Sequence, residues 1–555
     1  MANVLLSRSI NPKQVNMSDY LILKGWDTEN EIGLIEWLCG WGKTYISTST
    51  AANSILQKIN SEFGLGIQPY EVLFLVSRAA IREQSLASYS ATLREVNSVE
   101  ELENIGFIEE PHKIRIATYH KIGGELEEGK NVPNSVKLVI CDEFHSVFTD
   151  TFASQMFAIK KWLSETPIIR IGLTATPQPL EYLNGSRHWT QEKCAEQFGF
   201  KFRDIAAQTE PRFRFGQFHV YNGSMSAETA FREFRGNEDG KAIFFTFSAR
   251  TAAKLCRDNE DTLLFISEGN DKTDATGTLL RDYMDFENNN KLLRGKQIPQ
   301  GFNNVIATSC FREGVDLKDG AVKRIVIQSF LPHEIIQSLG RFRNNVDDVY
   351  IIANRAAFEM TQKQCNRAFE LLENYLASND EHILIEQYNR QRDADSPDDT
   401  QWFVNKYRGK YEIDYSIFTY WLYVFDSWYA TTTYRNDEFI TFLRKRLPNR
   451  KDYYRLMFSK YTDNEIIPES WDKTRTRVSL VNERKSKIGD VIAPYLNKKL
   501  FANSDERDEL VRSIGAIDEY GFSRKWTTVK KWLREAGYVI EDGREKNKHY
   551  SVIHL

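Results

Sequence analysis

Up to about residue 350, short runs of β-branched and aromatic residues alternate along the chain with stretches of helical period. The apolar runs predict strands at residues 72–77, 114–118, 138–141, 168–174, 242–246, 305–308 and 325–328. Helices such as 44–63 and 249–257 are expected between them. Strands that alternate with helices form parallel sheets, and ligands bind at the carboxyl ends of such strands. The segment 210–221 is expected to connect two units of this kind.

Beyond residue 357 the pattern changes to a helical period, as in residues 368–375, and a polar break follows at 393–399. Residues 402–439 are unusually aromatic, which fits either a buried core or stacking platforms for single-stranded bases. Near the end of the chain, an amphipathic helix closed by glycine (526–538) precedes a hairpin with a polar, basic turn at 541–548. This last pattern indicates a winged-helix-like domain. The expected domains are residues 1–208, 209–357, 358–500 and 501–555.

The composition is that of an ordinary soluble protein, with 41% apolar and 27% charged residues, and 555 residues are too many for one hydrophobic core. The first residues lack the apolar core of a signal peptide, and no run approaches the ~18 apolar residues that span a membrane, so a cytoplasmic protein without a membrane partner is expected. The six cysteines are scattered with no Cys-x-x-Cys pair, which argues against a zinc module or a disulfide framework.

Charge is unevenly distributed along the chain. Residues 401–555 hold 29 Lys/Arg and 22 Asp/Glu, a net charge of +7, whereas the whole chain carries −4, so residues 1–400 carry −11. A positive C-terminal third favours a polyanionic partner, although a solvated charged surface explains the charge about as well.

A glycine-rich turn, Gly40-Trp41-Gly42-Lys43-Thr44, opens the expected 44–63 helix. Its glycines let the backbone fold around phosphates, its lysine neutralises the β- and γ-oxygens, and its threonine hydroxyl is suited to ligate Mg²⁺. The longer Gly-x-x-x-x-Gly-Lys-Thr pattern is not met, because Trp37 occupies the position of its first glycine. The turn therefore predicts a site for ATP with Mg²⁺.

Adjacent carboxylates, Asp142 and Glu143, follow the apolar run at 138–141. Asp142 is expected to hold Mg²⁺, directly or through water, and Glu143 to orient and deprotonate the attacking water. His145, two residues further, is placed to sense the γ-phosphate or to contact a second domain. The phosphate loop and the acid pair both lie at strand ends, as a site for triphosphate hydrolysis requires.

Three further segments complete an ordered set: Leu173-Thr174-Ala175-Thr176-Pro177, the stretch 308–317, and Gln337-Ser338-Leu339-Gly340-Arg341-Phe342-Arg343. In order and spacing, the five motifs resemble the superfamily 2 helicases and translocases of the Asp-Glu-x-His type over roughly residues 30–350. The resemblance implies an α/β fold: two tandem RecA-like parallel-sheet domains with ATP between them, then a mainly helical region and a C-terminal winged-helix-like domain. The compact form is similar to helicases of phages and mobile elements, which implies a bacterial or phage-infected cytoplasm.

The resemblance also implies roles for the later motifs. Thr174, Ala175 and Thr176 would couple the nucleotide state to domain closure. Gly314 and Asp316 would approach the nucleotide from the second domain, with Asp316 near the ribose or the active-site water.

The last motif implies the catalytic arginine. Gln337 and Arg341 would reach the γ-phosphate, with the arginine acting as a finger. The family usually has another arginine where this chain has Asn344, and Arg343 is offset by one, so the finger is either Arg341 or Arg343. No adenine-reading glutamine is found before the phosphate loop, so the preference for ATP is inferred rather than seen.

The resemblance also implies contacts with a nucleic-acid backbone. Hydroxyls and amides that bind phosphates hold the strand without reading its sequence. The matching positions are Ser77, Arg78, Thr118, Tyr119 and His120 in the first domain, and Ser248, Arg250 and Thr308 in the second. Taken singly, each of them would equally fit a turn or a helix cap. In the winged-helix-like segment, duplex phosphates would meet Lys530, Lys531, Arg534, Arg544, Lys546 and Lys548, although such modules also dock proteins.

The sequence thus predicts an ATP-dependent superfamily 2 DNA helicase or translocase that unwinds or remodels a fork, junction or duplex end in replication or recombination, with 3′→5′ movement favoured by resemblance. One alternative is an RNA helicase with the same core. Another is an ATP-switched nucleic-acid sensor or clamp in a defence or packaging complex. A structural adaptor with an inactive ATPase is disfavoured because Lys43, Asp142, Glu143 and Arg341 are all present.

Overall fold

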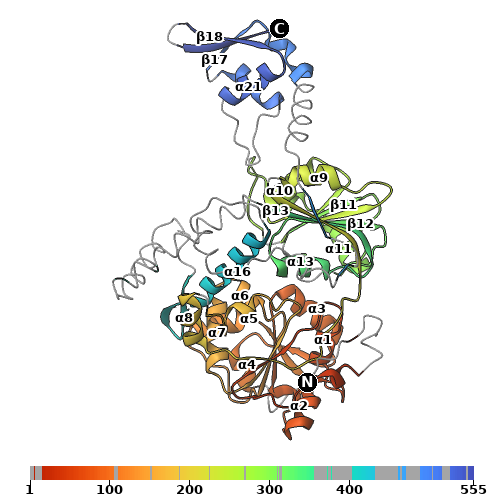
Figure 1. Cartoon of the computed structure of the whole chain (residues 1–555), viewed down its shortest axis with the longest axis vertical. Helices are drawn as coiled ribbons and strands as arrows, with labels where there is room; N and C mark the ends of the chain where they lie inside the picture. Colours follow the sequence, from red (N-terminus) through yellow and green to blue (C-terminus); the bar gives the residue numbers. More distant parts are fainter. Residues whose placement is uncertain are drawn as a thin grey trace. The chain divides into compact units, whose positions relative to one another are not determined.

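A computed structural model shows the architecture of the chain (Figure 1). It describes residues 6, 16–104, 110–150, 153–308, 311, 316–354, 372, 377, 403–431, 461–462, 466–469, 488–514 and 526–555, apart from short gaps at 187, 224, 268–269, 275, 503 and 546–547. The chain divides into two compact units. The first comprises Met1–Val220, Arg312–Gly320 and Ser329–Ile467, and the second Tyr221–Phe311, Ala321–Gln328 and Pro468–Leu555.

The first unit is built on a seven-stranded sheet of order β3-β4-β2-β5-β6-β1-β7, whose neighbouring strands are parallel. Its strands are β1 (Ile32–Ile35), β2 (Val72–Val76), β3 (Leu93–Glu95), β4 (Ile114–Thr118), β5 (Leu138–Cys141), β6 (Ile169–Leu173) and β7 (Phe202–Asp204). In the register, Phe74 lies opposite Ile116 on one side and Ile140 on the other. The apolar runs at the centre of this sheet were therefore interpreted correctly as strands.

Helices cover both faces of this sheet (Figure 1). Because side chains alternate along a strand, Leu73 and Leu75 enter one core whereas Phe74 and Val76 enter the other. The helical elements of the unit are η1 (Met17–Tyr20), α1 (Lys43–Thr48), α2 (Ile55–Phe63), η2 (Pro69–Glu71), α3 (Ala79–Tyr89), α4 (Val99–Asn104), α5 (Tyr119–Glu127), α6 (Ser146–Thr149), α7 (Gln155–Glu165), η3 (Leu180–Tyr182), α8 (Trp189–Phe198) and α13 (Pro332–Leu339).

The helix expected at 44–63 is two helices, so that prediction was wrong in one respect. The chain leaves the helical conformation at Ser49, and Ser54 starts a second helix by accepting a hydrogen bond from the Gln57 N–H. A serine that bonds to the free amides of a first turn favours a new helix start over continuation.

A second seven-stranded sheet has the order β10-β11-β9-β12-β13-β8-β16. Its strands are β8 (Phe215–Gly223), β9 (Lys241–Phe245), β10 (Thr262–Phe265), β11 (Asn304–Ala307), β12 (Val322–Ile327), β13 (Val346–Asn354) and β16 (Ile466–Glu469), and β10, β11, β9 and β12 are parallel. The accompanying helices are α9 (Ala227–Phe234), α10 (Ala249–Arg257), η4 (Leu280–Tyr283) and α11 (Phe286–Gly295). The expected α/β class with two parallel-sheet domains is confirmed, whereas much of the expected connector 210–221 is strand β8.

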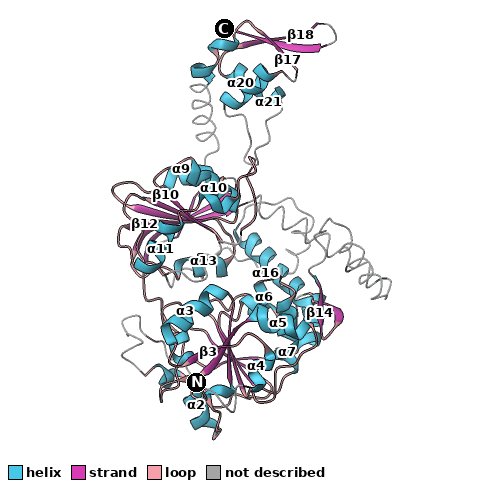
Figure 2. Ribbon diagram, turned by 180° about the vertical axis from the view of Figure 1, so that it is seen from behind, coloured by secondary structure: helices cyan, strands magenta, loops and turns pink. Residues whose placement is uncertain are grey.

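Residues 403–431, expected within a helical accessory domain, pack on the first unit. The antiparallel strands β14 (Val404–Tyr407) and β15 (Lys410–Ile413) lie beside α5 and α7 (Figure 2), and the long helix α16 (Tyr415–Thr431) packs on α8 and α6. Described aromatics of this stretch are buried, among them Phe403, Phe418 and Trp421, so the core interpretation is confirmed for them. The expected helix at 368–375 lies largely outside the described residues.

The C-terminal segment forms a small module of its own. Strand β17 (Lys499–Phe501) pairs with the hairpin β18 (Val539–Glu545) and β19 (Lys548–His554), and the helical elements are η6 (Ala493–Tyr495), α20 (Asp505–Ser513) and α21 (Trp526–Glu535). Gly537, with φ of 101°, follows α21 as expected for a glycine that ends a helix. Both strands of the hairpin extend further toward the turn than the sequence pattern indicated. No helix in the described part of the chain is long and apolar enough to cross a membrane.

Candidate functional site

The phosphate-loop motif forms a tight turn between β1 and α1. Gly40 and Gly42 have φ of 87° and 80°, a conformation that side chains with a Cβ rarely adopt, and Gly42 directly precedes α1. Between them Trp41 is fully buried, and its indole N–H donates to the Glu210 carbonyl at 2.7 Å. The tryptophan therefore anchors the loop while its glycines shape it.

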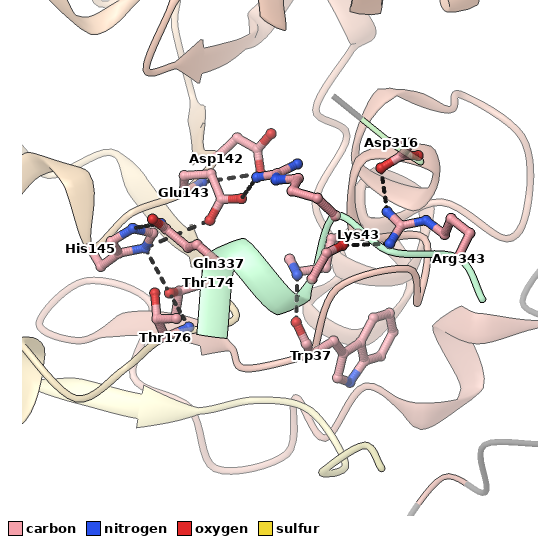
Figure 3. Close-up of polar contacts among 12 residues, drawn as sticks. Trp37, Lys43, Asp142, Glu143, His145, Thr174, Thr176, Asp316, Gln337 and Arg343 are labelled. Atoms are coloured by element: carbon pink, nitrogen blue, oxygen red, sulfur yellow. Dashed lines mark hydrogen bonds and ion pairs between the residues drawn. The ribbon is translucent and has the colours of Figure 1, made fainter. Parts of the chain in front are cut away.

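Two cations lie at this loop. Lys43 is 8% exposed, and its ammonium group donates to the Trp37 carbonyl (Figure 3). The guanidinium of Arg212 lies 5.7 Å from the centre of the Trp41 ring and donates to the Gly40 carbonyl at 3.3 Å. Arg212 also lines a small pocket together with Cys39, Phe215, Phe342 and Tyr461, among others. Sequence reasoning missed Arg212, because only the folded chain brings it to the loop.

The acid pair follows β5 and is largely buried. Asp142 is 6% exposed and accepts a hydrogen bond from the Glu143 N–H at 3.1 Å, and Glu143 has φ of 46°, in the left-handed region. A non-glycine residue held there is strained, and such strain gathers at functional sites. Within the described part of the protein, the Glu143 Oε2 atom is buried and has no hydrogen-bond partner. The turn thus holds a buried carboxylate oxygen that lacks a hydrogen bond and lies 3.6 Å from His145 Nδ1.

The two carboxyls differ in acidity because their surroundings differ. Burial, with the charge of the adjacent Glu143, raises the pKa of Asp142 to about 7, although Lys43 and Arg341 oppose this shift. Burial would also raise the pKa of Glu143, but the His145 imidazole and the charges of Lys43 and Arg341 outweigh it, so this pKa is lowered. Glu143 is therefore the more readily ionised member of the pair, as a base requires.

His145 connects three of the expected motifs (Figure 3). Its Nε2 lies 2.5 Å from Gln337 Nε2, and its Nδ1 lies 3.1 Å from Thr174 Oγ1 and 3.6 Å from Glu143 Oε2. Since the Gln337 amide N–H donates to Nε2, the ring proton is assigned to Nδ1, facing Thr174 and Glu143. Thr174 Oγ1 in turn accepts from the Thr176 N–H at 2.9 Å. Neighbouring Ala175 is 3% exposed and packs in the interior.

The two arginines of the last motif make different contacts. Arg341 lies 3.9 Å from Glu143 Oε1 and its side chain is 12% exposed. Arg343 donates to Asp316 Oδ1 at 2.6 Å and to the Gly340 carbonyl at 2.5 Å. Arg341 is thus directed at the acid pair, whereas Arg343 is held by its own neighbours. Gly314 lies outside the described residues.

Residues 8–179 match the family model described as the res subunit of type III restriction enzymes (ResIII). The match contains the phosphate loop, the Asp-Glu-x-His motif and the Thr-Ala-Thr motif. This part of the chain is therefore similar to the ResIII family.

Solved structures similar to the chain include helicases. The Mycobacterium smegmatis helicase Lhr, bound to single-stranded DNA and AMP-PNP, is 18% identical with a TM-score of 0.35, over 59% of this chain and 44% of that chain, so this chain spans less than half of Lhr. Saccharomyces cerevisiae Dbp5, bound to RNA and ADP BeF3, is 12% identical with a TM-score of 0.37, over 62% and 85%. Mss116p, bound to single-stranded RNA and AMP-PNP, is 12% identical with a TM-score of 0.37, over 79% and 89%. No curated protein matches the sequence.

The nucleic-acid contacts expected in the first unit lie in three settings. Ser77 is 4% exposed, and Thr118 caps α5 by accepting from the Lys121 N–H at 3.3 Å. Arg78 and His120, with side chains 46% and 38% exposed, both face Asp150, at 3.4 and 4.0 Å. Both side chains are accessible, and the Asp150 carboxylate offsets the charge of Arg78.

Tyr119 differs from its neighbours. It is fully buried in the core of the first unit, and its hydroxyl donates to the Asp142 carbonyl at 2.7 Å. A surface role for this side chain is therefore not supported. Its position instead fixes the backbone of the acid pair.

In the second unit, Ser248 Oγ caps α10 by accepting from the Thr251 N–H at 3.2 Å, and the exposed Arg250 donates to the Thr273 carbonyl at 3.1 Å. Thr308, half-buried, follows β11. Neither the Ser248 cap nor the Arg250 bond excludes a phosphate contact, because each leaves further donors on the residue.

The C-terminal basic residues also divide into groups. Lys530 is 17% exposed and donates to Asp542 at 2.8 Å, so it joins α21 to the hairpin. Lys531, Arg534, Arg544 and Lys548 are exposed, and Lys546 lies outside the described residues.

The chemistry of the acid pair fits a divalent cation. Burial makes the ionised form of Asp142 unfavourable, and a bound cation would stabilise that form. Carboxylate and hydroxyl oxygens are also ligand types that Mg²⁺ accepts. Asp142 and Thr44, the second residue of α1, supply those ligand types.

Proposed function

We propose that the protein is an ATP-driven motor that moves along nucleic acid, with DNA favoured, and unwinds or remodels it. The observation that carries this proposal is the cluster around Glu143, in which an ionised carboxylate, a motif histidine and an arginine from the last motif meet. A cluster that joins all these motifs suits hydrolysis that is linked to a change of conformation.

In this mechanism the phosphate loop holds the triphosphate, and Lys43 neutralises the β- and γ-oxygens. Asp142 and Thr44 would hold Mg²⁺, which supplies charge neutralisation between these phosphates when bound. Glu143, kept ionised by its neighbours, accepts the proton of the attacking water. Gln337 keeps the His145 proton on Nδ1, where it supports the ionised form of Glu143.

Arg341 is the finger in this proposal. It already lies within 4 Å of the acid pair, whereas Arg343 is bonded to Asp316 and to the Gly340 carbonyl. A guanidinium at this position offsets the charge that develops on the γ-phosphate during cleavage.

The choice of DNA rests on the C-terminal module. Its order of β17, α20, α21 and a two-stranded hairpin resembles that of a winged helix, which supports the proposal. Exposed basic residues lie on the helix and hairpin that would meet a duplex. Phosphate contacts of this kind give an affinity for nucleic acid that falls as the salt concentration rises. We expect 3′→5′ movement from the resemblance of the second motif.

The decisive experiment measures ATP hydrolysis by the full chain with single-stranded, duplex, forked and junction DNA and with the matching RNAs, together with strand displacement. DNA-stimulated hydrolysis with displacement is expected. Stronger stimulation by RNA would favour an RNA helicase, and tight ATP-dependent binding without displacement would favour a sensor or clamp. Absence of hydrolysis with every nucleic acid would contradict the motor.

The Glu143→Gln variant tests the proposed base. It should keep ATP binding, lose turnover, and accumulate a nucleic-acid-bound state, because only the proton acceptor has been removed. Glu196→Gln, on α8 with a side chain 65% exposed, is the matched control and should behave like the parent. Turnover of Glu143→Gln near the parent rate would exclude the assigned role.

A further inference from the structure

Helix α16 makes two polar contacts with elements that carry hydrolysis motifs. The Tyr423 Oη atom lies 2.9 Å from His333 Nδ1 and accepts from the His333 N–H at 3.3 Å. Three residues further, the Asp426 carboxylate accepts from the Tyr182 hydroxyl. Tyr423 and Asp426 are each 1% exposed, so both contacts are shielded from water.

The first contact leads directly to the motif histidine. His333 is the second residue of α13, and Gln337 lies one turn further along the same face of that helix. Gln337 bonds to His145 at 2.5 Å, and the rings of His333 and His145 lie 6.2 Å apart. The Tyr423 hydroxyl is therefore joined to the helix that positions the His145 proton.

The second contact reaches the segment after the Thr-Ala-Thr motif. Tyr182 closes η3, six residues beyond Thr176, and its ring lies 5.3 Å from that of Tyr423. One helix thus contacts both segments that meet at His145, because Thr174 bonds to the opposite nitrogen of the same ring.

The start of α16 is fixed to helix α7 of the first unit. Lys160 of α7 lies 2.5 Å from Asp414 and 2.6 Å from Ser416, and the side chains of Lys160 and Asp414 are each 2% exposed. Asp414 also accepts from the Ser416 N–H at 3.0 Å, at the first turn of α16. A helix held in this way has little freedom to slide, so its far end can hold other elements in place.

Packing alone does not require these polar groups. Much of the surface that α16 buries is aromatic or aliphatic, as at Phe418 and Trp421. Burying a hydroxyl and a carboxylate there is unfavourable unless they are hydrogen-bonded, and a bonded polar group fixes one geometry where apolar contacts tolerate several.

We propose that Tyr423 and Asp426 are positioning residues for ATP hydrolysis: they make α16 a brace that holds Gln337 of α13 and the segment after Thr176 in register around His145. The inference rests on the proposed ATPase activity. Loss of either contact would disturb that register, so a helix that follows the last motif in sequence influences the hydrolysis step.

The test compares Tyr423→Phe with Thr419→Val in the full chain. Each removes one buried hydroxyl from α16. The Thr419 hydroxyl bonds to the Ser416 carbonyl at 2.8 Å and to Cys194 of α8, and none of the bonds described for it reaches α13 or η3. Tyr423→Phe should lower kcat about ten- to hundredfold with an unchanged KM for ATP, because the phosphate-binding residues are untouched. Thr419→Val should keep the parent kcat.

Hydrogen exchange of the peptide covering 332–339, without nucleotide, tests the positioning itself. It should speed up in Tyr423→Phe and not in Thr419→Val. Unchanged exchange in Tyr423→Phe would overturn the brace whatever the activity, and so would equal kcat losses in both variants. A parent that hydrolyses no ATP would instead overturn the proposed function. Tyr182→Phe, which removes the donor to Asp426, gives a second variant with the same expected kcat loss should Tyr423→Phe not fold.

Discussion

Replacement of Arg341 by alanine tests the site most sharply, because the chain offers a second arginine two residues away as its control. Arg341 lies 3.9 Å from Glu143, and the two side chains are only 12% and 16% exposed. At this distance, with an effective dielectric constant of about 20, two unit charges interact by about 4 kcal/mol. A γ-phosphate that gains charge at a similar distance would lose comparable stabilisation, which corresponds to roughly a 10³-fold fall in kcat.

The assay is single-turnover ATP hydrolysis at saturating nucleic acid, with the affinity for ATP measured separately by equilibrium binding. Arg341→Ala should lose kcat about 10³-fold and keep its affinity for ATP within a few-fold. Arg343→Ala should lose less than about tenfold in kcat and should melt at a lower temperature, because it breaks the 2.6 Å contact with Asp316. Equal kcat losses in the two variants, or an Arg341→Ala variant within tenfold of the parent, would refute the assignment of the finger.

Three further predictions concern the scaffold. Lys160→Met should destabilise the first unit by about 3–5 kcal/mol, because it leaves the buried Asp414 carboxylate without its cation. The loss should appear as a lower urea midpoint, and an unchanged midpoint would contradict the pairing. Hydrogen bonds from Lys530 and Ser551 lower the pKa of Asp542. The stability that these bonds give the hairpin should be complete above pH ~4 and should be lost as the pH falls through the lowered pKa. Hydrogen exchange of the hairpin between pH 5 and 2.5 should show this loss, and the Asp542→Asn variant should not show it. Gly340→Ala would put a methyl 2.4 Å from Cys39 Sγ and should raise the KM for ATP several-fold through the adjacent phosphate loop, with partial recovery when Cys39→Gly is added.

The buried parallel strands could be predicted from the sequence because they are apolar on both faces. Residues 114–118 and 138–141 lie at the expected positions, and 72–77 differs by one residue. The hairpin at 404–413 could not be predicted in the same way, since its strands have only four residues each. Its one local signal is Arg408-Gly409, where both residues have positive φ, a turn that joins antiparallel strands.

The candidate site divides in the same manner. The residues within the phosphate loop are close to one another in sequence, and so are the two residues of the acid pair. The chemistry of each motif could therefore be recognised from local spacing alone. The contacts of Lys160 with Asp414 and of His333 with Tyr423 join positions 254 and 90 residues apart, and only folding brings them together. Arg341 and Arg343 are alike in sequence but differ in their neighbours, which is why the sequence left the finger open.

The packing of residues 403–427 against the preceding part of the first unit has a consequence for biosynthesis. The Gln197 side chain bonds to the Ile413 carbonyl, 216 residues later, so the helical face around α7 and α8 stays uncovered while that length is translated. At 5–20 residues per second this takes about 10–40 s. During that interval a nascent chain exposes apolar surface beside a lysine with no counterion, which makes this face a natural target for chaperones and makes a recombinant fragment ending near residue 210 prone to aggregate.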